Sequence, residues 1–404
     1  MTDLFWPGDH LAGDLMSDGA FLAAMVAVEQ AWLGALVDAG IAPADARADL
    51  SVADGDVETI ARRADVDGNP VSALIAVLRD RADAETARWL HRGLTSQDVL
   101  DTAVILCVRD VLIRVGVECA AQVRALSELI ETHRDAPALA RTLTQAALPS
   151  TLGAKISRWL AGVLDAAEPL AGLRTSLPVQ VGGAVGTLAA TTELAGSIDA
   201  ALALGDALAD RLMLAPALPW HTTRSPITRI GDALVTCCDS WGHLAADVTT
   251  GSRPEVGELA EGSGGGSSTM PHKNNPVRAV LIRRAALTAG PLGATLHAAS
   301  AASVDERSDG AWHAEWATLR TLARRTVVAA AHTSDLVCGL RFDEGRAAAN
   351  LAAANLAAAN GLLSEQQTMT ELTGRPGLSD YTGAADRVVD ATLSRARHFL
   401  EESS

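Results

Sequence analysis

The sequence predicts an all-α protein of three helical units, with an elongated bundle of long helices at its centre. Hydrophobic residues make up 48% of the chain and aromatic residues only 3%. Most of the apolar residues are alanine, leucine and valine, and alanine has no side-chain entropy to lose in a helix. Apolar residues also recur at helical spacing over long stretches with few breaks, which is typical of a helical bundle.

The first unit is expected over residues 1–105. Ser17 and Asp18 form a helix-start signal, and apolar periodicity follows from Phe21 to Leu36. Glycine and proline after that stretch end the helix. A second, acidic helical stretch runs to about Ala64, and a turn is expected over 67–70, where the sequence is Asp-Gly-Asn-Pro.

The second unit, residues 106–335 with the preceding helix start, is expected to hold the long helices. Its helical patterns cover Asp101–His133, Leu148–Leu173, Leu188–Leu214, Pro226–Thr249 and Asn275–Ala302. The third unit, residues 336–404, is short and contains an Ala-rich helix, a Gly-Arg-Pro-Gly turn and a terminal helix.

Composition restricts the class of protein. The net charge of −16 and the lack of a basic stripe argue against nucleic-acid binding, but a few convergent cations could still bind an anionic substrate. The five cysteines lack disulfide or metal-ligand spacing and are expected to be reduced and buried. We find no signal peptide and no uncharged run long enough to span a bilayer, so we expect a cytoplasmic protein without membrane contact.

The most informative segment is glycine-rich and runs through residues 262–276 as GSGGGSSTMPHKNNP. The glycines alone would indicate a flexible linker. A linker, however, has no need for Lys273 and Asn275 between two prolines, directly before a helix. Backbone N–H groups at such a helix start suit a carboxylate, and a mobile loop can close over a substrate.

This segment resembles the signature loop of the fumarase/aspartase superfamily, G-S-S-x-M-P-x-K-x-N-P, and the loop is expected over residues 258–278 within the second unit. Two further segments resemble other substrate-binding regions of that family. One is HRGLTSQD at 91–98, and the other is RTLTQAALPSTLG at 141–153. Without the resemblance, Thr95 to Asp98 could be only a polar helix cap.

The resemblance implies a lyase or cycloisomerase that acts on a small polycarboxylate without a cofactor or metal. It further implies a homotetramer whose active sites are shared between subunits. Ser267 takes the position of the family's proton carrier, and His91 and His313 are the other expected catalytic residues. Substrate binding is expected from Thr95, Ser96, Gln145, His221, Arg224, Ser268, Met270, Lys273 and Asn275.

Leu143 departs from the family pattern, because fumarases and adenylosuccinate lyases carry a histidine there. Further segments, such as GGAVGT at 182–187 and GAWHAEW at 310–316, resemble the 3-carboxy-cis,cis-muconate cycloisomerase branch, which commonly lacks that histidine. That branch closes its substrate to 4-carboxymuconolactone in protocatechuate breakdown. Two alternatives stay open: a β-elimination lyase of adenylosuccinate or another substituted succinate, and a non-catalytic structural homologue. Arg307 could be a substrate ligand or only a surface ion pair.

Overall fold

The computed structural model describes residues 3–53, 55–262, 264–266, 269–270, 273–358, 362–377 and 381–402. Helices dominate them, which confirms the all-α prediction. Contacts divide the chain into two compact units, each built from three stretches. Unit 1 comprises 1–114, 170–234 and 290–327, and unit 2 comprises 115–169, 235–289 and 328–404. The three consecutive units expected from the sequence are a different division, and they stay a prediction.

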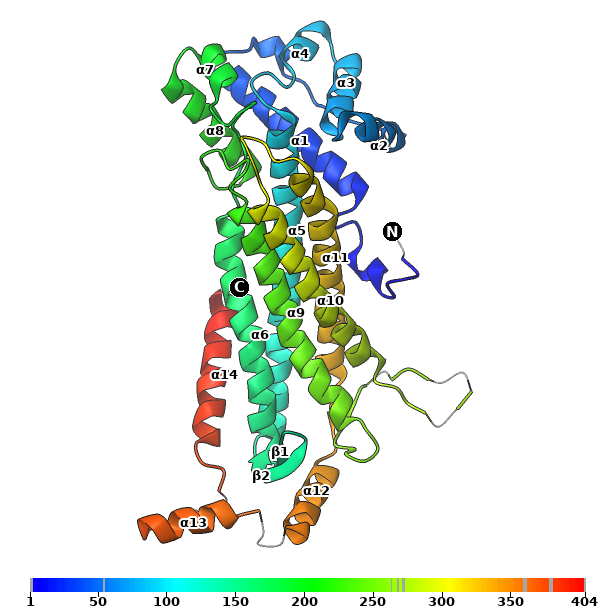
Figure 1. The fold of residues 1–404 in the computed structure, drawn as a ribbon, viewed down its shortest axis with the longest axis vertical. Coiled ribbons are helices and arrows are strands. Elements are labelled where there is room, and N and C mark those ends of the chain that lie inside the picture. Colours follow the sequence, from blue (N-terminus) through cyan, green and yellow to red (C-terminus); the bar gives the residue numbers. More distant parts are fainter. Residues whose placement is uncertain are drawn as a thin grey trace. The chain divides into compact units, whose positions relative to one another are not determined.

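Five long helices, which Figure 1 labels, each contribute a segment to both units. They are α5 (Ser96–His133), α6 (Leu152–Thr175), α9 (Ser225–Gly251), α10 (Val277–Ala301) and α11 (Gly310–Gly339). The predicted helix over 188–214 is two helices, α7 (Ala189–Ala195) and α8 (Ile198–Leu212). Gly196 separates them with a φ of 77°, a left-handed conformation that ends a helix.

Unit 1 also contains the N-terminal helices. They are η1 (Asp9–Ala12), α1 (Asp18–Asp38), η2 (Ala44–Ala46), α2 (Asp56–Asp67), α3 (Val71–Arg81) and α4 (Ala84–Trp89). The predicted start of α1 is confirmed, because the Ser17 hydroxyl accepts a hydrogen bond from the Ala20 N–H at 3.1 Å. Trp32 and Leu36 of α1 and Leu74 of α3 are fully buried in its core.

Helix α1 is long and apolar enough, by length and composition, to cross a membrane. Its most apolar window is 56% buried inside the protein. Glu29 lies in the middle of the helix and is fully buried. A buried helix of a protein core also meets these criteria of length and composition, and the burial of α1 fits such a helix.

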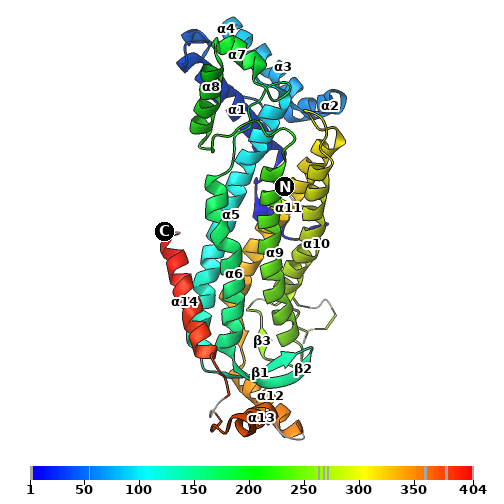
Figure 2. The ribbon, with the colours of Figure 1, turned by 60° about the vertical axis from the view of Figure 1, so that its left-hand side comes forward.

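Unit 2 contains a β-hairpin that was not predicted (Figure 2). Strands β1 (Pro137–Thr142) and β2 (Gln145–Thr151) pair antiparallel, and β2 occupies the first residues of the helix predicted from Leu148. A second small sheet joins β3 (Leu259–Ala260) and β4 (Arg341–Phe342). The unit ends in α12 (Glu344–Ala357), α13 (Ser364–Thr373) and α14 (Ala385–Glu402).

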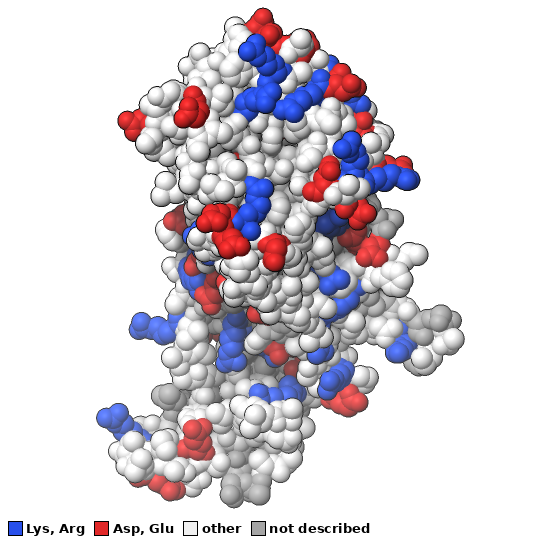
Figure 3. All heavy atoms as spheres, turned by 45° about the horizontal axis from the view of Figure 1, so that its top comes forward, with Lys and Arg blue, Asp and Glu red and all other residues white. Residues whose placement is uncertain are grey.

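Buried polar side chains in unit 2 form a connected network. Trp241 donates its indole N–H to Gln122 Oε1 at 2.8 Å, and Gln122 donates to the Ala330 carbonyl at 3.0 Å. All three groups are buried, and satisfying them avoids a desolvation penalty. On the face shown in Figure 3, basic and acidic side chains are interspersed, and the described residues of this face form no continuous basic stripe.

Candidate active site

The residues predicted for the site fall into two groups. Unit 1 holds His91, Thr95, Ser96, His221, Arg224 and His313, and unit 2 holds Gln145, Met270, Lys273 and Asn275. Ser267 and Ser268 lie outside the described residues. The geometry therefore concerns two separate clusters, one in each unit.

Asp98 organises the cluster in unit 1. It is fully buried near the start of α5, and its Oδ2 accepts the N–H groups of Thr95 at 2.9 Å and Gly183 at 3.0 Å. Its Oδ1 accepts the Gly182 N–H at 2.9 Å and lies 2.9 Å from His221 Nε2. Asp98 thus serves as the helix cap considered from the sequence, and it also ties the glycine turn at 182–183 to α5.

The glycines of this turn are required by close packing. A Cβ on Gly182 would lie 2.6 Å from His221 Cε1 and 3.1 Å from Gly186 Cα, and Gly183 has a φ of 70°. Any larger residue would clash at position 182, and a non-glycine residue would be strained at position 183. His221 is only 4% exposed, so in this structure it holds the turn against Asp98. A substrate contact from His221 stays a prediction.

Arg307 is the residue that sequence reasoning undervalued. It lies between α10 and α11, and its Nη2 donates to the Thr95 hydroxyl oxygen and, at 3.2 Å, to the Ala184 carbonyl. Arg307 is exposed, and no carboxylate of the described residues forms an ion pair with it. An exposed guanidinium beside the first residues of a long helix is suited to an anion. Its sequence context, Asp-Glu-Arg, gave no sign of the contact with Thr95.

Arg224 requires a correction. We expected it to bind a substrate carboxylate, but it is 2% exposed and all five of its N–H groups have acceptors within unit 1. Asp101 accepts at 2.7 and 3.1 Å, Glu315 at 3.0 and 2.6 Å, and the His221 carbonyl at 3.3 Å. No donor is left for a substrate, so Arg224 has a structural role.

Burial and charge act against each other in this ion-pair cluster. Burial lowers the pKa of Arg224, but the attraction of Asp101 and the hydrogen bonds that Arg224 donates to Glu315 and Asp101 outweigh it, and the net pKa is raised. For Glu315, burial outweighs the influence of Arg224 and raises the pKa of the carboxyl group. Trp312 adds an indole N–H to Asp101 Oδ1 at 2.9 Å. The cluster keeps its charges only because each has a partner.

The two histidines expected to be catalytic differ. His313 has Nε2 2.8 Å from the Gly68 carbonyl and Nδ1 3.2 Å from the Asp309 carbonyl. Because both nitrogens face acceptors, this arrangement does not favour proton exchange with a substrate. His91 uses only Nδ1, which lies 2.6 Å from Glu29 Oε1, and its Nε2 has no hydrogen-bond partner among the described side chains and backbone groups.

The hairpin of unit 2 carries Leu143 at its tip. Leu143 and Thr144 form the two-residue turn, with φ values of 48° and 73°, and Leu143 is 95% exposed. Gln145 is exposed beside them and donates to the Thr144 hydroxyl at 3.1 Å. Arg141 is committed elsewhere, because it donates to both carboxylate oxygens of Glu258 at 3.2 and 2.8 Å.

The two ends of the signature loop are joined. Gly265 and Asn275 exchange two backbone hydrogen bonds of 2.9 Å, and a Cβ on Gly264 would overlap the Asn274 side chain at 1.7 Å. The N–H groups expected to bind a substrate at the start of α10 are already occupied. Glu261 accepts from the N–H groups of Arg278 at 3.1 Å and Ala279 at 2.7 Å.

This occupancy corrects the expectation of a free helix N-terminus in unit 2. Lys273 and Met270 are exposed near the loop ends, and Asn275 is half-buried. Their contacts with a substrate stay a prediction. Within the described ranges, no group of three or more His, Cys, Asp or Glu side chains is placed to hold a metal ion.

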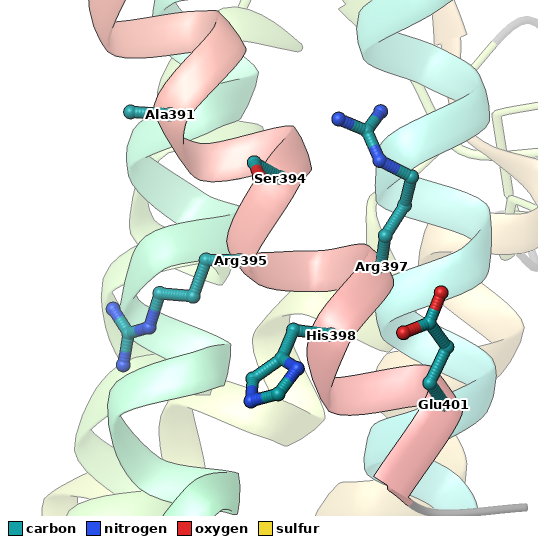
Figure 4. Close-up of a pocket in the computed structure, with 6 residues that line it drawn as sticks. All are labelled: Ala391, Ser394, Arg395, Arg397, His398 and Glu401. Carbon is teal, nitrogen blue, oxygen red and sulfur yellow. The ribbon is translucent and has the colours of Figure 1, made fainter.

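A surface depression on α14 is unrelated to the predicted chemistry. It is lined by Ala391, Ser394, Arg395, Arg397, His398 and Glu401 (Figure 4). Arg395 extends toward α6 and forms ion pairs with Asp165 at 2.7 Å and Glu168 at 2.6 Å. None of the six is a predicted site residue, and the ion pairs explain how α14 docks on α6.

Comparison with known proteins places these observations in a family. A lyase family model matches residues 22–289. The nitrosuccinate lyase of Streptomyces davaonensis is 45% identical over 311 residues, which cover 72% of this chain and 63% of that protein, so the chain spans less than two thirds of that relative. The 3-carboxy-cis,cis-muconate cycloisomerase of Bradyrhizobium diazoefficiens is 37% identical over 348 residues, 84% of this chain and 74% of that protein.

A solved structure agrees with the fold. The 3-carboxy-cis,cis-muconate lactonizing enzyme from Pseudomonas putida superposes with a TM-score of 0.85 and 29% identity, covering 96% of this chain and 97% of that chain. The family match spans more than half of the sequence and includes the signature loop, so the chain belongs to the lyase family of the fumarase/aspartase superfamily.

Proposed function

We propose that this enzyme acts as a cycloisomerase, converting 3-carboxy-cis,cis-muconate to 4-carboxymuconolactone. The observation that carries the proposal is the leucine at position 143, exposed at the tip of the hairpin. Related lyases place an acid there, and a leucine side chain cannot transfer a proton. A reaction whose departing group needs no proton is therefore the one that this position favours.

Lactonisation meets this requirement. A substrate carboxylate oxygen adds to one carbon of a double bond, and a proton adds to the neighbouring carbon next to another carboxylate. In the reverse direction that proton is removed, an aci-carboxylate forms, and the ring carboxylate leaves as a weakly basic anion. Hydroxide and amines are much stronger bases and leave readily only when protonated. Leu143 therefore favours lactone chemistry over the reactions of fumarases and adenylosuccinate lyases.

Within this proposal, separate residues carry the proton and bind the substrate carboxylates. Ser267 carries the proton, and Lys273 and Asn275 stabilise the aci-carboxylate, where negative charge develops. Arg307, the Thr95 hydroxyl and the start of α5 bind a second carboxylate. We also propose a homotetramer in which several subunits complete each site, as the family resemblance implies.

A second function is supported by the 45% identity to a nitrosuccinate lyase. Loss of nitrite and an adjacent proton from nitrosuccinate would leave fumarate. Nitrite is also a weakly basic anion that departs without a proton, so Leu143 is equally compatible with this elimination. The two substrates differ in their carbon skeleton and share a carboxylate next to the carbon that exchanges a proton.

A parallel assay separates the two functions. Purified protein is supplied with 3-carboxy-cis,cis-muconate, cis,cis-muconate, nitrosuccinate and adenylosuccinate. We expect the diene absorbance of the tricarboxylate to fall, at least about a hundredfold faster than for plain muconate, because charge-assisted hydrogen bonds to the third carboxylate are lost in the latter. Nitrite release without diene loss would replace the cycloisomerase by the elimination. Turnover of adenylosuccinate would refute the argument from Leu143.

The serine pair provides a second test. Ser267→Ala should lower turnover at least about a thousandfold without changing the oligomeric state, because it removes the proton carrier. Ser268→Ala is the matched control and should retain measurable activity. If Ser268→Ala lost activity and Ser267→Ala kept it, the assignment within the pair would be wrong.

A further inference from the structure

Glu29 and His91 form a carboxylate–imidazole pair in unit 1 that the proposed chemistry does not yet use. His91 Nδ1 lies 2.6 Å from Glu29 Oε1. The Glu29 side chain is fully buried and that of His91 is 18% exposed. The second Glu29 oxygen, Oε2, is buried without a hydrogen-bond partner in the part of the chain that the structure describes. Burying a carboxylate with one oxygen left without a hydrogen bond costs folding free energy.

His91 is also held in an unfavourable backbone conformation. Its φ is 62°, a left-handed value that glycine adopts freely and other residues adopt only uncommonly. The residue stands in the segment between α4 and α5, close in sequence to Thr95. Strain of this kind persists only where the surroundings enforce it, and it is concentrated at functional sites.

The surroundings of His91 do enforce it. The neighbouring carbonyl groups all have side-chain donors: Arg79 Nη2 donates to Leu90 at 2.8 Å, Trp32 Nε1 to Arg92 at 2.7 Å, and the Thr191 hydroxyl to Gly93 at 3.1 Å. Glu29 and Trp32 come from α1, and Arg79 from α3. Buried elements on several sides thus fix one short segment and the direction of one imidazole.

We infer that Glu29 is a positioning residue for His91. A carboxylate can only accept, so it requires a hydrogen on Nδ1 and leaves Nε2 as the nitrogen that exchanges a proton or hydrogen bond with the substrate. Glu29 therefore fixes both the orientation and the tautomer of His91. The inference rests on the proposed function to the extent that it takes His91 to be a site residue.

A double-mutant cycle tests this coupling. His91→Asn is the central variant because asparagine tolerates a positive φ, so the fold is kept while the ring is lost. We expect kcat to fall roughly a hundredfold or more for His91→Asn, and about tenfold to a hundredfold for Glu29→Gln. KM should change less than kcat in both variants. In the His91→Asn background, Glu29→Gln should have no further effect on kcat, because its partner is already absent.

Asp9→Asn is the matched control. Asp9 is another buried carboxylate of unit 1, paired with Arg324 at 2.8 Å. Its replacement should reduce thermal stability and leave kcat and KM unchanged. The inference would be overturned if the losses of kcat in the two single variants added up in the double variant, or if His91→Asn kept full activity. The pair would then have only a structural role.

A spectroscopic readout separates this inference from the proposed function. In sedimented protein with 15N-labelled histidine, solid-state NMR should show one ring with Nδ1 protonated that disappears in His91→Asn and shifts in Glu29→Gln. This result is expected even if the wild-type protein turns over none of the assayed substrates, in which case only the proposed function fails. A His91 ring protonated at Nε2 alone would refute the positioning role.

Discussion

Arg224 binds both oxygens of Asp101, with Nη1 2.7 Å from Oδ2 and Nη2 3.1 Å from Oδ1. Asp101 lies on α5 and Arg224 precedes α9, and Glu315 of α11 binds the other edge of the same guanidinium. Within unit 1, the cluster therefore connects α5, α11 and the start of α9. Arg224, which we expected from the sequence to bind a substrate, uses its hydrogen bonds within this cluster instead.

Removing the guanidinium should destabilise the fold. We expect Arg224→Met to lower the free energy of unfolding by about 3–5 kcal/mol, because Asp101 and Glu315 would be left buried without a cation between them. Chemical denaturation followed by circular dichroism measures the change. Arg62→Gln, which breaks an exposed ion pair with Glu58 on α2, should change stability by less than about 0.5 kcal/mol. A stable Arg224→Met enzyme with only a raised KM would restore the substrate-binding role.

The sequence predicted the fold class and several elements because those signals are local. The Ser17 cap and the apolar spacing of α1 are visible within one stretch of chain, and so is the glycine loop before α10. The role of Arg224 was not visible, because its partners Asp101 and Glu315 lie far from it in the sequence. The choice between the two roles considered for Arg307 could not be made for the same reason, since Thr95 lies 212 residues away in the sequence.

The hairpin was missed because its turn has the wrong residues. Two-residue hairpin turns with positive φ at both positions favour Asn-Gly, and here the sequence is Leu143-Thr144. Nothing in the sequence around Arg141 marks two strands. The resemblance to the family identified the segment, but not its conformation.

Restoring the favoured turn should stabilise the protein. We expect Leu143→Asn combined with Thr144→Gly to raise the free energy of unfolding by about 1 kcal/mol, because both residues then fit a positive φ. Leu202→Asn on α8 is the matched control. Leu202 is 41% exposed and helical, so asparagine should lower stability there by a few tenths of a kcal/mol, roughly the difference in helix propensity. An equal loss in both proteins would show that Leu143 contributes through packing with another subunit.

The cysteines should be nearly unreactive in the folded protein. Cys107, Cys119, Cys237 and Cys238 are buried, and Cys338 is exposed. Burial raises the pKa of the Cys107 thiol to about 12 and also raises that of Cys338, so the reactive thiolate is scarce at neutral pH. A chromogenic disulfide reagent should label at most one thiol per native chain, and Cys338→Ser should abolish that reaction. All five thiols should react in denaturant, and fast native labelling of a second one would contradict the burial.

The raised pKa of Cys107 also has a consequence for stability at alkaline pH. The folded state keeps this thiol protonated up to a pH of about 12, whereas the unfolded chain ionises it near 9.0. The stability from the neutral thiol is therefore fully present below pH 9 and is lost as the pH rises toward 12. Cys107→Ala should show a smaller alkaline loss than the wild-type protein. An identical pH dependence in both proteins would show that folding does not raise the pKa of the Cys107 thiol.

Arg307 should determine substrate affinity. Its Nη2 contacts the Thr95 hydroxyl and the Ala184 carbonyl, and its positive charge has no carboxylate partner among the described residues. We expect Arg307→Gln to raise KM roughly tenfold to a hundredfold, the effect of losing a charged hydrogen bond. Arg307→Lys should recover only part of the affinity, because an ammonium group cannot hold Thr95 and a carboxylate in one plane.

The contact with Thr95 makes this prediction specific. Thr95→Val keeps the shape of the side chain but removes the hydroxyl that accepts from Arg307, so the two variants should be non-additive in KM. Arg62→Gln on α2 controls for the loss of one surface charge and should leave KM unchanged. Circular dichroism should show no unfolding in either site variant, since both side chains are at least partly exposed. If KM were unaffected by Arg307→Gln, the substrate carboxylate would have to be bound by other groups, and the start of α5 would be only a helix cap.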